Sequence, residues 1–359
     1  MSRFSRCVKL PIACIGGASV IGSACAQSSV TLYGRVDAGL LYMSRTLNAK
    51  TGLNDGHQLA AVDGGSSPTV FGLTGVEDLG GGAKVRFTLE SGVSVMNGGI
   101  NNSNGNFFGR QAFVSLAGKP GEVKLGLQYS PFFLSLYETD PRGFSQIGSG
   151  LVNYANNVAG TGAFNSNGMS YTSPAFAGFQ GSALLAFGGK AGDFQAGRQY
   201  SGNLRYQLGN FVINAALYSG NGGGTVSTPI PSTLDFSGRM VGALYRFANV
   251  TAKAQFVNFK VAHSFNSNIY GFGLDWNATP ALNVNGGVYY RTDRNDSANS
   301  SILGAIGVVY SLSTRTALYT QFAAVNNRGA MNSGLLMGYA INGLQGTTTG
   351  VTAGIRHNF

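Results

Sequence analysis

The chain has 359 residues, and 24 Lys and Arg side chains against 14 Asp and Glu give it a formal net charge of +10. Only 11% of its residues are charged, whereas it holds 55 Gly, 23 Phe and 16 Tyr with only 9 Pro, a composition that suits many short strands and tight turns better than packed helices. The positive charge is not gathered in a basic run, and no base-stacking module accompanies it, so no nucleic-acid partner is expected.

Residues 1–26 are typical of a secretory signal peptide. Three basic residues lie within the first nine positions, a mostly apolar run follows at 10–21, and Ala24-Cys25-Ala26 forms a small-x-small cleavage motif. The apolar run is shorter than the roughly 20 residues of a membrane-spanning helix. We therefore expect cleavage after Ala26 and one mature domain over 27–359.

All three cysteines, Cys7, Cys14 and Cys25, lie in this expected signal peptide. The mature chain should then contain neither disulfides nor thiolate metal sites. Cys25 could alternatively be a lipoprotein acylation site, but Gly22 stands where such a signal carries a Leu-like residue.

The first segment of the expected mature chain alternates between apolar and polar residues. In 28–43, Val30 and Leu32 lie on one side of an extended strand, and Tyr33 and Arg35 lie on the other. Such a strand has either a packed core on one face and water on the other, or lipid on one face and a wet lumen on the other.

Runs of this kind recur along the whole chain, and we identify sixteen of them. They lie at 28–43, 67–76, 82–96, 106–118, 121–131, 165–173, 177–189, 197–208, 209–219, 237–247, 249–260, 266–277, 279–292, 301–312, 314–325 and 347–359. Their connections are of two kinds. Many are short turns, whereas 44–66, 132–164, 220–236, 293–300 and 326–346 are long and rich in Gly, Asn and Ser.

Short turns at one end and long loops at the other are typical of an outer-membrane barrel. Aromatic residues also crowd the strand ends, as in the interfacial girdles of such barrels. The sequence therefore predicts an all-β protein that spans a membrane as an antiparallel barrel, with a soluble β-sandwich as the alternative.

The chain ends on one more alternating strand, VTAGIRHNF, in which Ile355, His357 and Phe359 share one parity. A frayed soluble terminus would gain little from an exposed aromatic ring. A soluble edge strand could show the same pattern, so this ending favours a strand of the barrel wall only together with the rest of the chain.

Several motifs together resemble the Gram-negative general porin family of beta-proteobacterial type. In chain order they are SVTLYGRVDAGLLY, FGLTGVEDLGGGAKVRFTLESG, FGRQAFVSLAG, YTSPAFAGF, YSLSTRTALYTQFAAVNN and GIRHNF. The resemblance implies a sixteen-stranded, homotrimeric barrel in the outer membrane, with a long third loop, 132–164, folded into the lumen as a constriction. It also implies that the barrel-assembly machinery reads the terminal strand ending in Phe359.

The resemblance implies the charged residues of the constriction as well. Glu138 and Asp140 are the first acids of the third loop and are the candidates for its acidic side. The basic wall is expected to comprise Arg35, at the family's first-strand position, and Arg110 in FGRQAF, with Arg86 and Lys84 on the polar side of 82–96.

This sequence departs from the family pattern at three positions that usually carry Arg. Val70, Leu127 and Phe164 stand there instead. The basic cluster should therefore be thinner than usual, and only a weak preference for anions is expected.

No enzymatic site is apparent in the sequence. The three histidines, His57, His263 and His357, have no metal-ligand spacing, and motifs such as G-x-S-x-G, H-E-x-x-H and the phosphate-binding loop are missing. Neither a cofactor nor a metal is expected, and Asp293, Asn295 and Asp296 are most simply part of a surface loop.

The function that we expect is a general diffusion porin, a channel for passive passage of ions and small hydrophilic solutes. Its other partners would be the lipid and lipopolysaccharide of the outer membrane. Two alternatives remain open: a solute-specific channel, and a non-conducting barrel that acts through its surface loops.

Overall fold

The computed structural model describes residues 29–158, 163–224, 234–338 and 342–359. The expected signal peptide, 1–26, lies outside these residues. Within them, no helix is both long and apolar enough to cross a membrane.

The described chain is built almost entirely of strands. They are β1 (Ser29–Met43), β2 (Gln58–Asp63), β3 (Val70–Gly80), β4 (Ala83–Gly92), β5 (Gln111–Gly118), β6 (Gly121–Tyr129), β7 (Phe164–Thr172), β8 (Phe179–Ala186), β9 (Gln199–Leu208), β10 (Phe211–Gly220), β11 (Phe236–Phe247), β12 (Val250–Val261), β13 (Asn266–Asn277), β14 (Leu282–Asp293), β15 (Ser300–Ser311), β16 (Thr316–Arg328) and β17 (Gly346–Asn358). Two helices, α1 (Pro131–Thr139) and α2 (Gly150–Val158), lie between β6 and β7.

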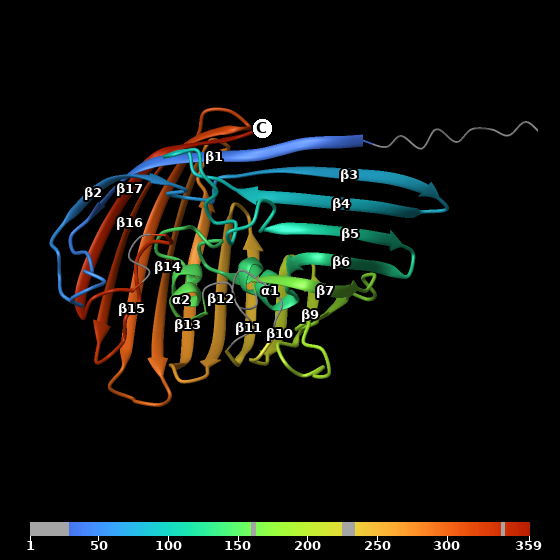
Figure 1. Cartoon of the computed structure of the whole chain (residues 1–359). Helices are drawn as coiled ribbons and strands as arrows, with labels where there is room; N and C mark the ends of the chain where they lie inside the picture. Colours follow the sequence, from blue (N-terminus) through green and yellow to red (C-terminus); the bar gives the residue numbers. More distant parts are fainter. Residues whose placement is uncertain (1–28, 159–162, 225–233, 339–341) are drawn as a thin grey trace, which may run out of the picture.

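The strands form a closed antiparallel barrel of sixteen positions (Figure 1). From β3 to β17 each strand pairs with the next, and β17 pairs with β1 over 35–43 to close the barrel. On its other edge β1 pairs with β3 near its start and with β2 near its end. Because β2 and β3 share this edge, they occupy one barrel position between them.

Each predicted run overlaps one strand of this barrel, so the predicted sixteen-stranded antiparallel barrel is confirmed. The structure adds three elements in segments that were expected to be loops. These are β2 within 44–66, and α1 and α2 at 131–158.

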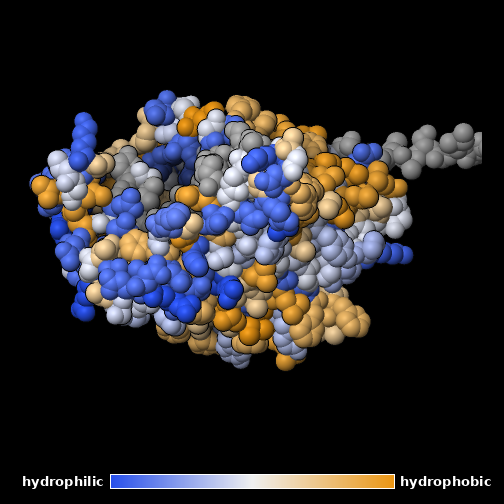
Figure 2. Space-filling model, turned by 60° about the horizontal axis from the view of Figure 1, so that its bottom comes forward, coloured by the Kyte–Doolittle hydropathy of each residue, from blue (hydrophilic) through white to orange (hydrophobic). Residues whose placement is uncertain are grey.

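The two faces of the barrel wall differ in the way the alternation predicts. On β1, Val30 and Leu32 are 66% and 57% exposed, whereas Asp37 is fully buried. On β16 the same holds for exposed Leu318 and buried Gln321. Figure 2 shows broad apolar stretches on the surface of the molecule, as a lipid-facing wall requires. We call the opposite, polar face the inner face.

The segment 131–158 packs against the inner face of β9–β12. Helix α1 begins where Ser130 accepts a hydrogen bond from the amide of Phe133 and Pro131 occupies the first turn. In Figure 1 both helices lie beside β10–β13. One side of the inner face is therefore covered by protein.

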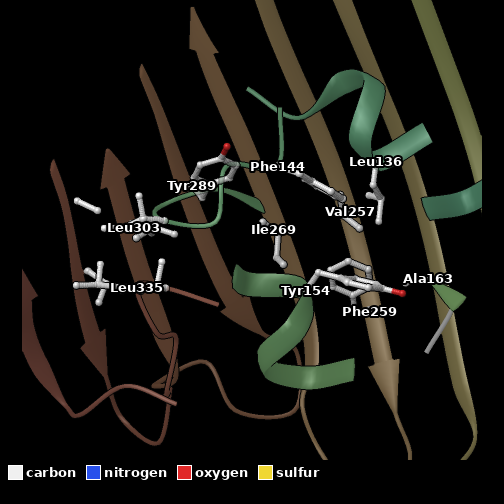
Figure 3. Close-up of a cluster of buried hydrophobic side chains, with 14 of the residues drawn as sticks. Leu136, Phe144, Tyr154, Ala163, Val257, Phe259, Ile269, Tyr289, Leu303 and Leu335 are labelled. Atoms are coloured by element: carbon white, nitrogen blue, oxygen red, sulfur yellow. The ribbon is translucent and has the colours of Figure 1, made fainter. Parts of the chain in front are cut away.

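A hydrophobic core joins this segment to the wall (Figure 3). Phe132 and Leu136 of α1 and Tyr154 of α2 are at most 2% exposed and lie among wall residues such as Phe259. Phe132 fits because its ring covers Gly238 of β11, where a side chain would collide with it. This core fixes the position of both helices on the wall.

Candidate functional site

A cavity of about 450 Å³ lies between the segment 131–158 and the wall formed by β1, β3, β4 and β6. Its polar lining comes mainly from the wall and includes Tyr33, Arg35, Glu90, Arg110, Tyr129 and Asn358. Its apolar lining comes mainly from the segment and includes Phe133, Leu134, Tyr137, Phe144 and Leu151. The cavity thus has two chemically distinct sides.

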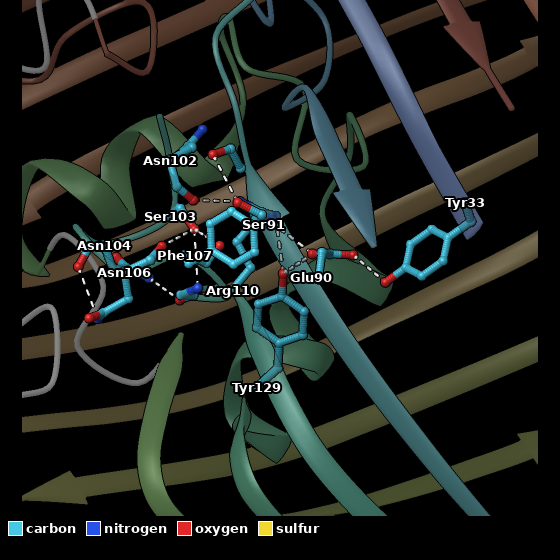
Figure 4. A network of polar contacts seen from close by, with 12 residues as sticks. Tyr33, Glu90, Ser91, Asn102, Ser103, Asn104, Asn106, Phe107, Arg110 and Tyr129 are labelled. Atoms are coloured by element: carbon cyan, nitrogen blue, oxygen red, sulfur yellow. Dashed lines mark hydrogen bonds and ion pairs between the residues drawn. The ribbon is translucent and has the colours of Figure 1, made fainter. Parts of the chain in front are cut away.

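Glu90 and Arg110 form the strongest charged contact of this cavity (Figure 4). Arg110 Nε donates to Glu90 Oε1 at 2.8 Å, and each of the two side chains is 11% exposed. Tyr33 donates to Glu90 Oε2 at 3.0 Å, and Arg110 Nη2 donates to the hydroxyl of Tyr129 at 3.0 Å. The charge of Arg110 is therefore balanced by Glu90, an acid whose role the sequence did not reveal.

Arg35 is held differently. Its Nε donates to Asn358 Oδ1 of β17 at 2.9 Å, and it forms no ion pair with any residue that the structure describes. It lines the same cavity as Arg110 and Glu90. Because Glu90 and Arg110 cancel, Arg35 leaves the charged lining with a surplus of one positive charge.

The other two predicted wall residues lie outside this cavity lining. Lys84 is 3.8 Å from Asp78, and Arg86 is 3.9 Å from Glu122. Both basic side chains are more than 40% exposed, so these ion pairs are weak. Of the four predicted basic residues, the structure brings Arg35 and Arg110 together.

The structure does not bring the two predicted loop acids to Arg35 or Arg110. Glu138 on α1 accepts from Arg205 Nε of β9 at 2.9 Å and from Asn214 Nδ2 at 3.0 Å. It contributes to a second cavity of about 340 Å³, whose lining includes the acid Asp275 and two basic side chains, Arg246 and Lys253. These two form no ion pair in the described parts of the chain.

Asp140 is fully buried and holds the turn between α1 and α2. Its carboxylate accepts hydrogen bonds from the backbone amides of Arg142, Phe144 and Gly150, and from the hydroxyl of Tyr289 on β14. Burial raises the pKa of Asp140, and these donors oppose that rise. Its contacts are those of a residue that fixes the backbone of the segment.

Arg142 fastens the same turn to more distant strands. Its Nε donates to Asn285 of β14 at 3.1 Å, and its Nη2 donates to Gln321 of β16 at 2.7 Å. The segment is therefore hydrogen-bonded to strands that range from β9 to β16.

Two of the three positions that depart from the family pattern line the first cavity. Val70 and Phe164 contribute to its surface, whereas Leu127 is absent from that lining. The guanidinium of Arg110 lies 5.6 Å from the ring centre of Phe164. Apolar groups therefore occupy positions where the resemblance implied additional positive charge.

The predicted assembly residues lie on the outer face of β17 or directly after it. Ile355 and Phe359 are 47% and 43% exposed, and His357 is also exposed. His357 Nδ1 lies 2.8 Å from the hydroxyl of Thr316 on β16. Among the described residues there is no cluster of three His, Cys, Asp or Glu side chains that could hold a metal.

Comparison with known proteins identifies the family. The model of the Gram-negative porin family matches residues 13–330. The chain is 33% identical to outer membrane porin protein 32 of Delftia acidovorans, over 94% of this chain and 96% of that protein. It is 29% identical to major outer membrane protein P.IB of Neisseria lactamica, over 93% and 95% of the two chains.

A solved structure agrees with these sequence relatives. The anion-selective porin from Comamonas acidovorans matches with a TM-score of 0.78 and 30% identity, covering 93% of this chain and 100% of that one. The chain belongs to the Gram-negative porin family and forms a β-barrel channel of the outer membrane.

Proposed function

We propose that this protein is a general diffusion porin through which ions and small hydrophilic solutes pass, with a weak preference for anions. The observation that carries this proposal is the cavity between the wall and the segment 131–158, whose charged lining has a surplus of one positive charge at Arg35. The second cavity adds no surplus, because its two basic side chains, Arg246 and Lys253, face two acids, Glu138 and Asp275. The similar fold of the anion-selective porin from Comamonas acidovorans also supports a preference for anions.

The segment that we propose as the constriction is 132–164, of which 159–162 lie outside the described residues. Contacts of α1 with β9–β12 and the bonds of Arg142 to β14 and β16 support this role. In this proposal Arg35 and Arg110 provide the basic side of the constriction and Glu90 provides an acid. Glu138 and Asp140 then act on the field indirectly, by holding the segment in place.

We also propose that the barrel is a homotrimer, that it contacts outer-membrane lipid and lipopolysaccharide, and that Ile355, His357 and Phe359 serve as the assembly signal. Membership of the porin family favours a channel over an enzyme.

Planar-bilayer recording tests the proposed function. Refolded mature protein should give conductance steps in potassium chloride, and a salt gradient should give a reversal potential shifted mildly toward anions. The double variant R35Q/R110Q should move that potential toward cations, because it removes one unpaired cation and leaves Glu90 unpaired. A folded barrel that conducts no ions would contradict the proposal and favour a barrel that acts through its loops.

A further inference from the structure

The apolar side of the first cavity is unusual for a surface that faces a water-filled pore. Leu134 and Tyr137 lie on the side of α1 that points away from the hydrophobic core, and they remain 48% and 54% exposed. Exposed apolar side chains on the outer barrel face meet lipid, but these two line the cavity instead. A surface of this kind marks a place where an apolar group can bind.

Aromatic rings extend this surface to the polar wall. Phe133 stacks on Tyr129 with ring centres 5.2 Å apart, and Phe164 lies 5.3 Å from the same tyrosine ring. Phe144 packs edge-on against Tyr137 at 5.8 Å. Phe144 is 7% exposed and lies 5.4 Å from Phe133, so the rings form a continuous aromatic cluster from the segment to β6.

The charges at this surface restrict the solute further. Glu90 and Arg110 neutralise each other at 2.8 Å, so Arg35 is the cation of the lining that remains available to an anion. One available cation can balance one negative charge of a solute, so a second negative charge would find no partner in this lining. A mostly apolar cavity with a few placed polar groups is the usual form of a small-molecule site, and 450 Å³ is within the range of such sites.

From these observations we infer that the channel favours monovalent anions that carry an aromatic ring, such as aromatic monocarboxylates, over aliphatic anions of the same charge. This inference rests on the proposed diffusion function and names the solute class of its narrow region. The carboxylate would meet the guanidinium of Arg35, while the ring moves along Phe133, Leu134 and Tyr137. One ring contact corresponds to a preference of roughly two- to tenfold.

The test is a bi-ionic reversal-potential measurement on the refolded mature barrel, with sodium benzoate on one side and sodium acetate on the other. Simple diffusion favours acetate, because acetate is smaller and moves faster in water. We expect a benzoate-to-acetate permeability ratio that exceeds the ratio of their aqueous mobilities by roughly two- to tenfold, as one ring contact provides. A ratio at or below the ratio of mobilities would overturn the inference.

Variants separate the ring contact from the charge. L134N/Y137S should lower the benzoate-to-acetate ratio toward the mobility ratio, whereas L53S, in a surface loop outside the cavity lining and 68% exposed, should leave it unchanged. Benzylammonium and methylammonium should both permeate less readily than the two anions, because Arg35 repels both cations. An unchanged ratio in L134N/Y137S would also overturn the inference.

Potassium chloride distinguishes failure of this inference from failure of the proposed function. Normal chloride conductance without a ring preference would refute the inference and leave the diffusion porin intact. No conductance in any salt would refute the proposed function itself.

Discussion

Phe359 and Gly34 exchange two backbone hydrogen bonds, each 3.1 Å long, and the ring of Phe359 covers the α-carbon of Gly34. A side chain at Gly34 would collide with that ring and with the carbonyl oxygen of Val70. The last residue of the chain therefore extends the pairing that closes the barrel, at a point of β1 that only glycine suits.

G34A should destabilise the closed barrel, because overpacking a fitted contact costs about 1–3 kcal/mol. Thermal unfolding in detergent, followed by circular dichroism, measures this loss. G304A is the matched control, since a side chain at Gly304 of β15 would meet no atom within 4 Å. Adding F359A to G34A should restore part of the stability, and no restoration would show that the ring contact is not the cause.

E90Q should shift the reversal potential toward anions. The variant removes the carboxylate that balances Arg110 and leaves that guanidinium charged in the cavity lining. Single-channel recording in a potassium chloride gradient provides the measurement. E77Q is the control, because Glu77 is exposed on β3 and absent from the cavity lining. Equal potentials for E90Q and E77Q would contradict the assigned role of Glu90.

D140N should loosen the segment 131–158 without opening the barrel wall. An amide cannot accept all the bonds that three backbone amides and Tyr289 donate to the carboxylate, and hydrogen bonds to charged groups contribute about 1.5–3 kcal/mol each. We expect noisier open-channel current and faster amide exchange in the segment. D296N, at an exposed loop position, should change neither. Exchange rates that match the wild type would refute this role.

F132A should weaken the attachment of α1, because Phe132 is fully buried against Gly238 and Phe259. Truncation of a buried Phe costs about 3–5 kcal/mol. Hydrogen exchange of the α1 amides reports the change locally. L134A on the same helix should cost less than about 0.5 kcal/mol, as expected for a surface position. Similar effects of the two variants would show that α1 is not held by this core.

The barrel itself could be predicted from the sequence because a lipid-facing wall imposes a period of two on every strand. The exposed side chains of Val30, Leu32 and Leu318 lie at the apolar positions of that pattern. Strand β2 was not predicted, because its six residues lie within 44–66, a long stretch with the composition of a loop. Helix α1 carries a local signal in the dipeptide Ser130-Pro131, which marks a helix start.

The candidate site was harder to predict from the sequence than the barrel. The direction of a side chain on the segment 131–158 depends on partners that are distant in the chain. Asp140 and Glu138 are two residues apart, yet one is buried beneath the turn and the other contacts Arg205 on β9. Glu90 could have been noted from its place on the polar side of its strand. Its pairing with Arg110, which directly precedes the neighbouring strand β5, is not visible in the pattern.

The bonds of the segment 131–158 also determine the order in which the molecule can form. They connect Thr139 with Gln255, and Arg142 with Asn285 and Gln321, pairs that lie 116, 143 and 179 positions apart in the chain. Contacts over such separations carry a large entropic cost and form late in folding. The segment can therefore complete these bonds only once β16 is in place, because Gln321 lies on that strand.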